Sequence, residues 1–97
     1  MENPGVSQTS TIGLTMKYPR IEAATVIDDH TLLIEFNNKQ KKKYDITPLL
    51  KKDIFSPLKN LTLFKSVQVD QGGFAIVWTD RIDISEFELW SNGQAVP

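Results

Sequence analysis

Apolar and polar residues alternate along two neighbouring stretches, and this pattern restricts the fold more than any other feature of the chain. In the first stretch, Ile21–Ile27, the residues Ile21, Ala23, Thr25 and Ile27 alternate with their neighbours; the second stretch is Leu32–Phe36. A period of two residues is typical of strands that bury one face. The polar residues 28–30 lie between the stretches, which predicts a β-hairpin. A turn at Asn37–Gln40 and a third strand at Lys41–Ile46 extend the hairpin to an antiparallel meander.

The next segment carries two signals for the start of a helix. Thr47-Pro48 and Ser56-Pro57 each place a hydroxyl residue before a proline, and proline is favoured in the first turn. The apolar residues from Leu49 to Phe64 recur at irregular spacings, which favours two or three short helical turns over one long helix. We interpret this segment as a connection that covers the core rather than as a ligand site.

A second β-region follows. Alternation returns at Val67–Val69, and Gly72-Gly73 predicts a turn because glycine tolerates a positive φ. Phe74, Ile76 and Trp78 are then expected to share one face of a strand. Asp80-Arg81 predicts another turn, which leads into a short strand from Ile82 to Ile84.

Ser85-Glu86-Phe87-Glu88 matches the capping box that begins many helices. In this motif the Ser85 hydroxyl accepts a hydrogen bond from the Glu88 N–H, and the Glu88 carboxylate reaches back to the Ser85 N–H. Negative charge in a first turn is also favoured by the helix dipole. Gly93 lies where such a helix would end. The motif predicts a short C-terminal helix and gives Glu86 and Glu88 a structural role.

These elements predict a single α+β domain with an antiparallel β-meander, short helical turns, a second β-hairpin and a short C-terminal helix. The predicted boundaries are a flexible N-terminal tail at 1–15, the domain at 16–93 and a C-terminal tail at 94–97. Residues 1–15 are rich in Ser, Thr, Gly and Asn, which bury too little surface to order a chain. The predicted core consists of Ile21, Val26, Leu32, Ile34, Phe36, Leu50, Phe55, Leu58, Phe64, Val67, Val69, Phe74, Ile76, Trp78, Ile84 and Leu89.

Composition excludes several classes of chemistry. The 97 residues include no cysteine, which removes disulfides, thiolate metal sites and thiol nucleophiles. His30 is the only histidine, so one chain cannot form a site with several histidines, and we interpret His30 as a solvated turn residue. We therefore predict no catalytic residue, cofactor or metal. The chain has neither a secretory signal nor an apolar run of about 20 residues, and we expect a cytoplasmic protein.

Two tryptophans and two aspartates near the C-terminus form one candidate interaction surface: Trp78, Asp80, Asp83 and Trp90. The two carboxylates could instead bind a hard cation, do the acid–base work of an enzyme, or bind a small ligand beside Trp78. The neighbouring sequence supplies no further cluster of metal ligands, and aspartate is common in turns such as the one predicted at Asp80. A structural role for both aspartates is the interpretation we favour.

A run of lysines forms a second candidate surface: Lys39, Lys41, Lys42 and Lys43, with Lys51 and Lys52 close behind. Several lysines can neutralise phosphates, so nucleic-acid binding is one interpretation. Lysines on an exposed strand also prevent edge-to-edge pairing of sheets, and the formal net charge of −1 gives no general attraction to nucleic acid. We favour the solvated strand.

From Tyr18 to Trp90 the sequence resembles the bacterial family catalogued as domain of unknown function 2442. The matching segments are Tyr18-Pro19-Arg20, Leu32-Leu33-Ile34-Glu35-Phe36-Asn37, Tyr44-Asp45-Ile46-Thr47-Pro48-Leu49-Leu50, Phe55-Ser56-Pro57-Leu58, Leu63-Phe64-Lys65-Ser66-Val67, Val69-Asp70, Ile76-Val77-Trp78, Asp83-Ile84 and Leu89-Trp90. The chain departs from the family pattern at Lys39 and Arg81, where glycine is usual, and at Trp90, where tyrosine is usual. Both glycine positions bear on turn geometry, because an L-residue resists positive φ.

The resemblance implies a small α+β domain and supplies no catalytic residues. Family members occur alone or joined to a helix-turn-helix segment, and we expect this chain to lack that extension. They are often encoded beside another small protein, which implies pairing of the toxin–antitoxin kind. Our leading hypothesis is a non-catalytic, regulatory module that binds a partner protein, and homo-oligomers are compatible with it. Nucleic-acid binding through the lysines and ligand binding through Asp80 and Asp83 are the alternatives.

Overall fold

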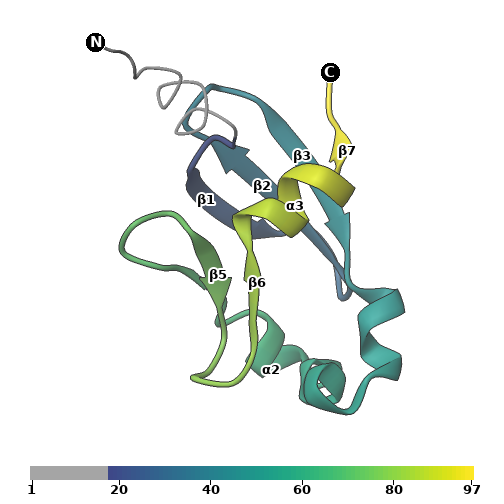
Figure 1. Ribbon diagram of the computed structural model, residues 1–97. Coiled ribbons are helices and arrows are strands. Elements are labelled where there is room, and N and C mark those ends of the chain that lie inside the picture. The colour runs from purple at the N-terminus through teal and green to yellow at the C-terminus, as the bar shows by residue number, and fades with distance from the viewer. Residues whose placement is uncertain (1–17) are drawn as a thin grey trace, which may run out of the picture.

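The computed structural model describes residues 18–97, in which antiparallel strands form two sheets joined by short helices (Figure 1). The predicted tail at 1–15 lies outside the described residues. The strands are β1 (Ile21–Val26), β2 (Thr31–Phe36), β3 (Lys41–Asp45), β4 (Gln68–Val69), β5 (Ala75–Val77), β6 (Asp83–Ser85) and β7 (Gln94–Ala95). The helical segments are η1 (Thr47–Lys51), η2 (Asp53–Lys59), α2 (Leu61–Phe64) and α3 (Glu86–Asn92). The predicted α+β class is confirmed. None of these helices is long and apolar enough to cross a membrane.

The larger sheet contains the predicted meander and has the strand order β1-β2-β3-β7. Leu32 of β2 lies opposite Val26 of β1 and Tyr44 of β3. Residues directly opposite each other share a face of the sheet. Leu32 and Tyr44 are both buried, so this face of the sheet points into the core. Lys42, opposite Ile34, lies on the same face.

A β-bulge changes the expected alternation in β1. Ile21 pairs with Phe36, whereas Ala23 already pairs with Glu35, so Glu22 is the extra residue. An extra residue shifts the side chains of the residues before it to the opposite face of the strand. The simple alternation predicted Ile21, Ala23, Thr25 and Ile27 on one face, and that prediction is wrong. The bulge instead brings Ile21 and Ala24 to the core face.

The smaller sheet has the order β4-β5-β6. It meets the larger sheet where the Ile21 N–H donates to the Gly73 carbonyl at 2.9 Å. Gly73 has φ +73, and a Cβ there would lie 2.6 Å from the Ile21 oxygen. Only glycine fits both this backbone conformation and this close approach. The predicted glycine turn therefore also serves as the junction between the sheets.

The β5–β6 turn forms without the glycine usual in the resembling family. Arg81 does not have a positive φ; among non-glycine residues in 18–97, only Lys39 does, at 76°. The Thr79 hydroxyl oxygen accepts from the N–H groups of Arg81 and Ile82, each at 3.1 Å. A threonine side chain thus closes the turn locally.

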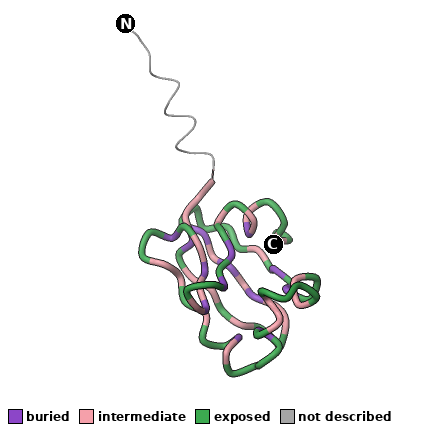
Figure 2. The backbone as a smooth tube through the Cα atoms, turned by 60° about the horizontal axis from the view of Figure 1, so that its bottom comes forward, coloured by how far each residue is buried: buried purple, intermediate pink, exposed green. Residues whose placement is uncertain are grey.

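Buried residues occur on strands of both sheets and on η2, α2 and α3, and Figure 2 marks them in purple along the backbone. Trp78 stacks on Phe64, and its indole N–H donates to the Phe64 carbonyl at 2.8 Å. The fully or nearly fully buried apolar residues are Ile21, Leu32, Ile34, Phe36, Tyr44, Ile46, Leu58, Phe64, Ile76, Trp78, Ile82, Ile84 and Leu89. Sequence reasoning omitted Tyr44, Ile46 and Ile82. The other predicted core residues pack partly buried against this cluster, except Phe74.

Phe74 is the clear error in the predicted core, since half of it is exposed. The strand β5 begins only at Ala75, so Phe74 lies at the end of the turn, outside the face that Ile76 shares with the core. The helical connection begins at Thr47 with Pro48 in its first turn, as predicted, whereas Ser56-Pro57 does not start a helix. Pro57 lies inside η2, and Asn60 caps α2 by accepting from the Leu63 N–H at 3.2 Å.

Helix α3 begins at the predicted cap, because the Ser85 hydroxyl oxygen accepts from the Glu88 N–H at 3.1 Å. The reverse bond of the capping box is not observed; the Glu88 carboxylate accepts from the Tyr44 hydroxyl at 2.8 Å. The predicted tail at 94–97 also begins differently. Gln94 and Ala95 form β7 and pair with Lys43 and Lys42. Pairing satisfies backbone groups along the edge of β3, which explains why these residues are ordered.

We expect Lys39→Gly to raise the free energy of unfolding by about 0.5–1 kcal/mol. The left-handed backbone costs an L-residue about 1–2 kcal/mol, and the greater freedom of glycine in the unfolded chain offsets part of that gain. Urea unfolding at equilibrium measures the difference. Gln40→Gly is the control, since Gln40 is exposed in the same turn and lacks a positive φ. A loss of stability in both variants would show that Lys39 bears no strain.

We expect Gly73→Ala to lower the free energy of unfolding by at least about 2 kcal/mol, because it combines a positive φ with a clash against the Ile21 carbonyl. Thermal denaturation measures the loss. Gly72→Ala is the matched control, since its new Cβ meets only the ring of the half-exposed Phe74, which can rotate away. Equal losses in both variants would contradict a special role for Gly73.

Candidate interaction surface

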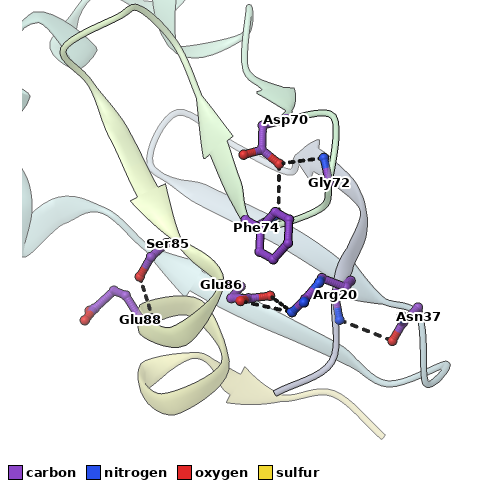
Figure 3. Close-up of polar contacts among 8 residues, drawn as sticks. All are labelled: Arg20, Asn37, Asp70, Gly72, Phe74, Ser85, Glu86 and Glu88. Carbon is purple, nitrogen blue, oxygen red and sulfur yellow. Dashed lines mark hydrogen bonds and ion pairs between the residues drawn. The ribbon is translucent and has the colours of Figure 1, made fainter. Parts of the chain in front are cut away.

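Arg20 precedes β1 and is fixed by contacts at its backbone and its side chain (Figure 3). Its N–H donates to the Asn37 side-chain oxygen at 3.3 Å, and its carbonyl accepts from the Asn37 N–H at 2.8 Å. Its guanidinium Nη1 donates to both carboxylate oxygens of Glu86, at 3.2 and 3.1 Å. The Glu86 side chain is only 15% exposed. Arg20 therefore joins the start of the larger sheet to the first turn of α3.

Phe74 lies against the other side of the Arg20 guanidinium, with the Arg20 Cζ atom 4.0 Å from the ring centroid. The Asp70 carboxylate holds the preceding turn by accepting from the N–H groups of Gly72 at 3.2 Å and Phe74 at 2.8 Å (Figure 3). A Cβ at Gly72 would lie 2.2 Å from the Phe74 ring, so glycine leaves the space that the ring occupies. The ring therefore packs on Arg20 and over Gly72 although half of Phe74 is exposed.

A second aromatic contact lies beside the same ion pair. Tyr18 and Phe87 meet edge to face with 5.1 Å between ring centroids, and Phe87 is 51% exposed. Tyr18 is two residues before Arg20, and Phe87 directly follows Glu86. We call these five residues, Tyr18, Arg20, Phe74, Glu86 and Phe87, the Arg20 face. Aromatic residues and arginine are the side chains most enriched where proteins bind one another.

The interaction surface predicted from the two tryptophans is not formed as one exposed surface. Trp78 is 8% exposed and belongs to the core. Trp90 packs edge to face on Phe36, at 5.1 Å, and beneath the Lys42 ammonium group. Asp80 and Asp83 are exposed. Each indole packs on an aromatic ring from another part of the chain, Trp78 on Phe64 and Trp90 on Phe36. The local sequence pattern does not predict these contacts.

The Arg20 face was missed for the same reason. Sequence reasoning placed Phe74 in the core and gave Glu86 to the helix cap. Arg20 was noted only as part of a matching segment. The ion pair between Arg20 and Glu86 spans 66 positions, and no periodicity connects such positions.

The lysine run does not form one surface either. Lys42 lies on the core face of β3, where its ammonium group is 3.9 Å from the centroid of the Trp90 ring and donates to the Trp90 carbonyl. Lys41 and Lys43 point to the opposite, exposed face, and Lys39 is exposed in the turn. The edge that these residues were expected to guard is also partly paired with β7.

Tyr44 and Glu88 lie on the other side of α3 from the Arg20 contact and join it to β3. The Tyr44 hydroxyl donates to the Glu88 carboxylate at 2.8 Å. Burial raises the pKa of Tyr44, and the hydrogen bond and charge of Glu88 raise it further. Tyr44 therefore remains a neutral donor at physiological pH.

The hairpin turn between β1 and β2 brings together the side chains that could contribute metal ligands. Ligand atoms of Asp28, Asp29 and His30 lie within 4.8 Å of one another, and all three residues are exposed or half-buried. The backbone N–H of His30 lowers the pKa of Asp28, and hydrogen bonds from Thr47 lower the pKa of Asp45. His30 lies in the turn as predicted, and Asp45 approaches its Nδ1 atom at 3.3 Å.

We expect Tyr44→Phe to lower the free energy of unfolding by about 1.5 kcal/mol at neutral pH, because it removes a hydrogen bond to a charged group. The raised pKa of Tyr44 stabilises the fold below the ordinary tyrosine value of 10.0, and this contribution is lost as the pH rises above that value. The difference in the free energy of unfolding between wild type and variant should therefore become smaller in alkaline solution. Chemical unfolding at several pH values measures it. A gap that stays constant or widens would contradict the assignment.

The comparisons with known proteins identify the family. The family model described as "Protein of unknown function (DUF2442)" matches residues 21–95, which include every strand of both sheets and all of α3. No curated protein and no solved structure gave a match. The matched region covers most of the chain and contains every segment that carries the resemblance noted from the sequence except Tyr18-Pro19-Arg20, which directly precedes it. The chain therefore belongs to the DUF2442 family of proteins of unknown function.

Proposed function

We propose that this chain is a non-catalytic bacterial module that acts in the cytoplasm and binds a partner protein through the Arg20 face. The partner is a protein encoded by a neighbouring gene, in a pairing of the toxin–antitoxin kind. The observation that carries the proposal is that half-exposed Phe74 packs on Arg20, while half-exposed Phe87 directly follows Glu86, the ion-pair partner of Arg20. The family match is compatible with this role and assigns no activity.

The arrangement has the features of an interface hot spot. Phe74 is 50% and Phe87 51% exposed, so a partner that covers both rings gains the hydrophobic energy that the free domain leaves unused. Arg20 already packs on the Phe74 ring in the free domain, so binding orders fewer side chains and loses less entropy. Aromatic residues and arginine in such settings contribute most of the energy of many interfaces.

The surroundings of the one histidine support a non-catalytic role. Thr31 Oγ1 lies 3.1 Å and Asp45 Oδ1 lies 3.3 Å from the same ring atom, Nδ1 of His30. A catalytic triad needs the nucleophile on one ring nitrogen and the acid on the other. Here both groups compete for one nitrogen, and Nε2 faces Asp29 at 3.6 Å. This arrangement does not activate Thr31.

Nucleic-acid binding through the lysines remains the alternative, and the geometry favours it less. The Lys42 ammonium group contacts the ring and the carbonyl of Trp90. Only Lys39, Lys41 and Lys43 of the run are exposed. Tyr44, the aromatic residue that follows these lysines in the sequence, is buried and cannot stack on a base.

We expect the double variant Phe74→Ala/Phe87→Ala to lose the partner while keeping its fold. The purified full chain would be used to capture proteins from a lysate of its own organism, and the captured protein would then be titrated by calorimetry. Loss of a hot spot worth about 2 kcal/mol corresponds to an affinity at least about thirtyfold weaker. Because both rings are half-exposed, thermal unfolding should change little.

Ile54→Ala/Leu61→Ala is the matched control, since it removes two other exposed apolar side chains from η2 and α2. This control should retain the partner. Equal binding by both double variants would refute the Arg20 face as the site, and failure to capture any specific protein would refute the proposed function. Capture of nucleic acid that is lost as salt rises would establish the alternative.

A further inference from the structure

Strand β6 has a neighbour on one side only within the described sheets, because the order of the smaller sheet is β4-β5-β6. Hydrogen bonds at both ends define which backbone groups face that neighbour. The Trp78 N–H donates to the Ile82 carbonyl at 2.9 Å, and the Glu86 N–H donates to the Phe74 carbonyl at 2.8 Å. Bonded pairs alternate along an antiparallel ladder, so Ile84, midway between, also faces β5.

It follows that the backbone of Asp83 points away from β5, together with the N–H of Ser85. Asp83 lies opposite Val77 and Ser85 lies opposite Ala75, at the positions of the ladder that do not exchange hydrogen bonds. The N–H and carbonyl of Asp83 and the N–H of Ser85 form none of the backbone hydrogen bonds that join different elements, turns and caps in residues 18–97. The open edge of β6 thus presents a donor, an acceptor and a second donor to any strand placed beside it.

A groove lies along this edge, between β6 and residues of β3, η1, η2 and α3. Its volume is about 250 Å³, and residues of β6 form one wall. Leu49 and Phe55 line it from η1 and η2, and Tyr44 and Glu88 line it from β3 and α3. A larger cavity of about 590 Å³ shares Tyr44, Leu49 and Glu88 with it, so the two adjoin. The edge is therefore accessible and is bordered by apolar side chains.

The net charge of the groove determines which kind of peptide segment can bind there. Four carboxylates line the two cavities, those of Asp28, Asp45, Asp83 and Glu88, against two lysines, Lys43 and Lys52. This excess of negative charge favours a basic segment and disfavours a second copy of the same groove, since like charges placed together repel.

The alternation of side chains along β6 adds a second requirement for the occupant. Ile84 points to the core face of the sheet, whereas Asp83 is exposed on the other face.

We propose that β6 binds an extended segment of a partner protein as an additional strand, with apolar side chains opposite Ile84 alternating with lysine or arginine opposite Asp83. The main-chain bonds of Asp83 and Ser85 provide the pairing, and the side-chain alternation provides the specificity, as in other complexes formed by strand addition. This site is separate from the Arg20 face and goes beyond the function proposed for that face.

The test is an NMR titration of the isotope-labelled full chain with a short, end-capped synthetic peptide in which valine alternates with lysine. We expect saturable shifts of the Asp83, Ile84 and Ser85 amide signals. Amide hydrogen exchange at Asp83 and Ser85 should slow by about tenfold or more, because these N–H groups become bonded. A peptide in which glutamate replaces lysine should not bind. Binding of both peptides with equal affinity would overturn the proposed specificity.

Two variants test the pairing and the charge of Asp83; the first removes its N–H together with its carboxylate, and the second changes the charge alone. Asp83→Pro removes the outward N–H, which the ladder with β5 does not use, and proline is tolerated at such edge positions. Asp83→Lys reverses the charge and keeps the backbone. Each should weaken peptide binding by about tenfold, an amount typical of one lost interaction of 1.4 kcal/mol. Glu22→Lys is the matched control, because it makes the same charge change at an exposed residue of β1, outside the groove.

Undiminished binding to Asp83→Lys, or a loss equal to that of Glu22→Lys, would overturn the proposal. Peptide shifts confined to β1 or β7 would also overturn it. If Asp83 and Ser85 became protected without peptide as the protein concentration rose, a second copy would be the occupant. The Phe74→Ala/Phe87→Ala variant should bind the peptide normally, so failure of this site and failure of the Arg20 face are distinguishable.

Discussion

One hydrogen bond, from the Ile21 N–H to the Gly73 carbonyl, joins the two sheets, and the arrangement of the domain depends on that contact. The sheets share no strand, so their relative position is set by side-chain packing and by this junction. Glycine permits the left-handed backbone and the close approach at Gly73. Because Arg20 precedes Ile21 and Phe74 follows Gly73, the same contact also places the arginine beside the aromatic ring.

Local patterns were sufficient to predict the fold class and most elements. The alternation at Leu32, Ile34 and Phe36 identified the core face of β2, and Ser85 identified the start of α3. Both depend only on neighbouring residues, whose spacing is visible in the sequence. The bulge at Glu22 and the strand β7 were not visible in this way, since each is defined by its pairing with another strand.

The candidate sites were harder to predict than the fold because their residues meet across long stretches of chain. Glu88 had a sufficient local explanation in the capping box, yet its carboxylate bonds to Tyr44. Lys42 stood within a run of lysines, yet the alternation of β3 turned it toward Trp90. Hydrophobic spacing also could not show that Phe74 would lie one residue outside β5, where the ring stays exposed.

Helix α3 is attached at both ends, to β6 in the smaller sheet and, through Gly93, to β7 in the larger one. Its first turn contributes Glu86 to the Arg20 face and Glu88 to the groove beside β6. The carboxylates of Glu86 and Glu88 therefore lie on opposite sides of one short helix that is connected to a strand at each end. Any displacement of that turn would move one carboxylate on each of the two surfaces.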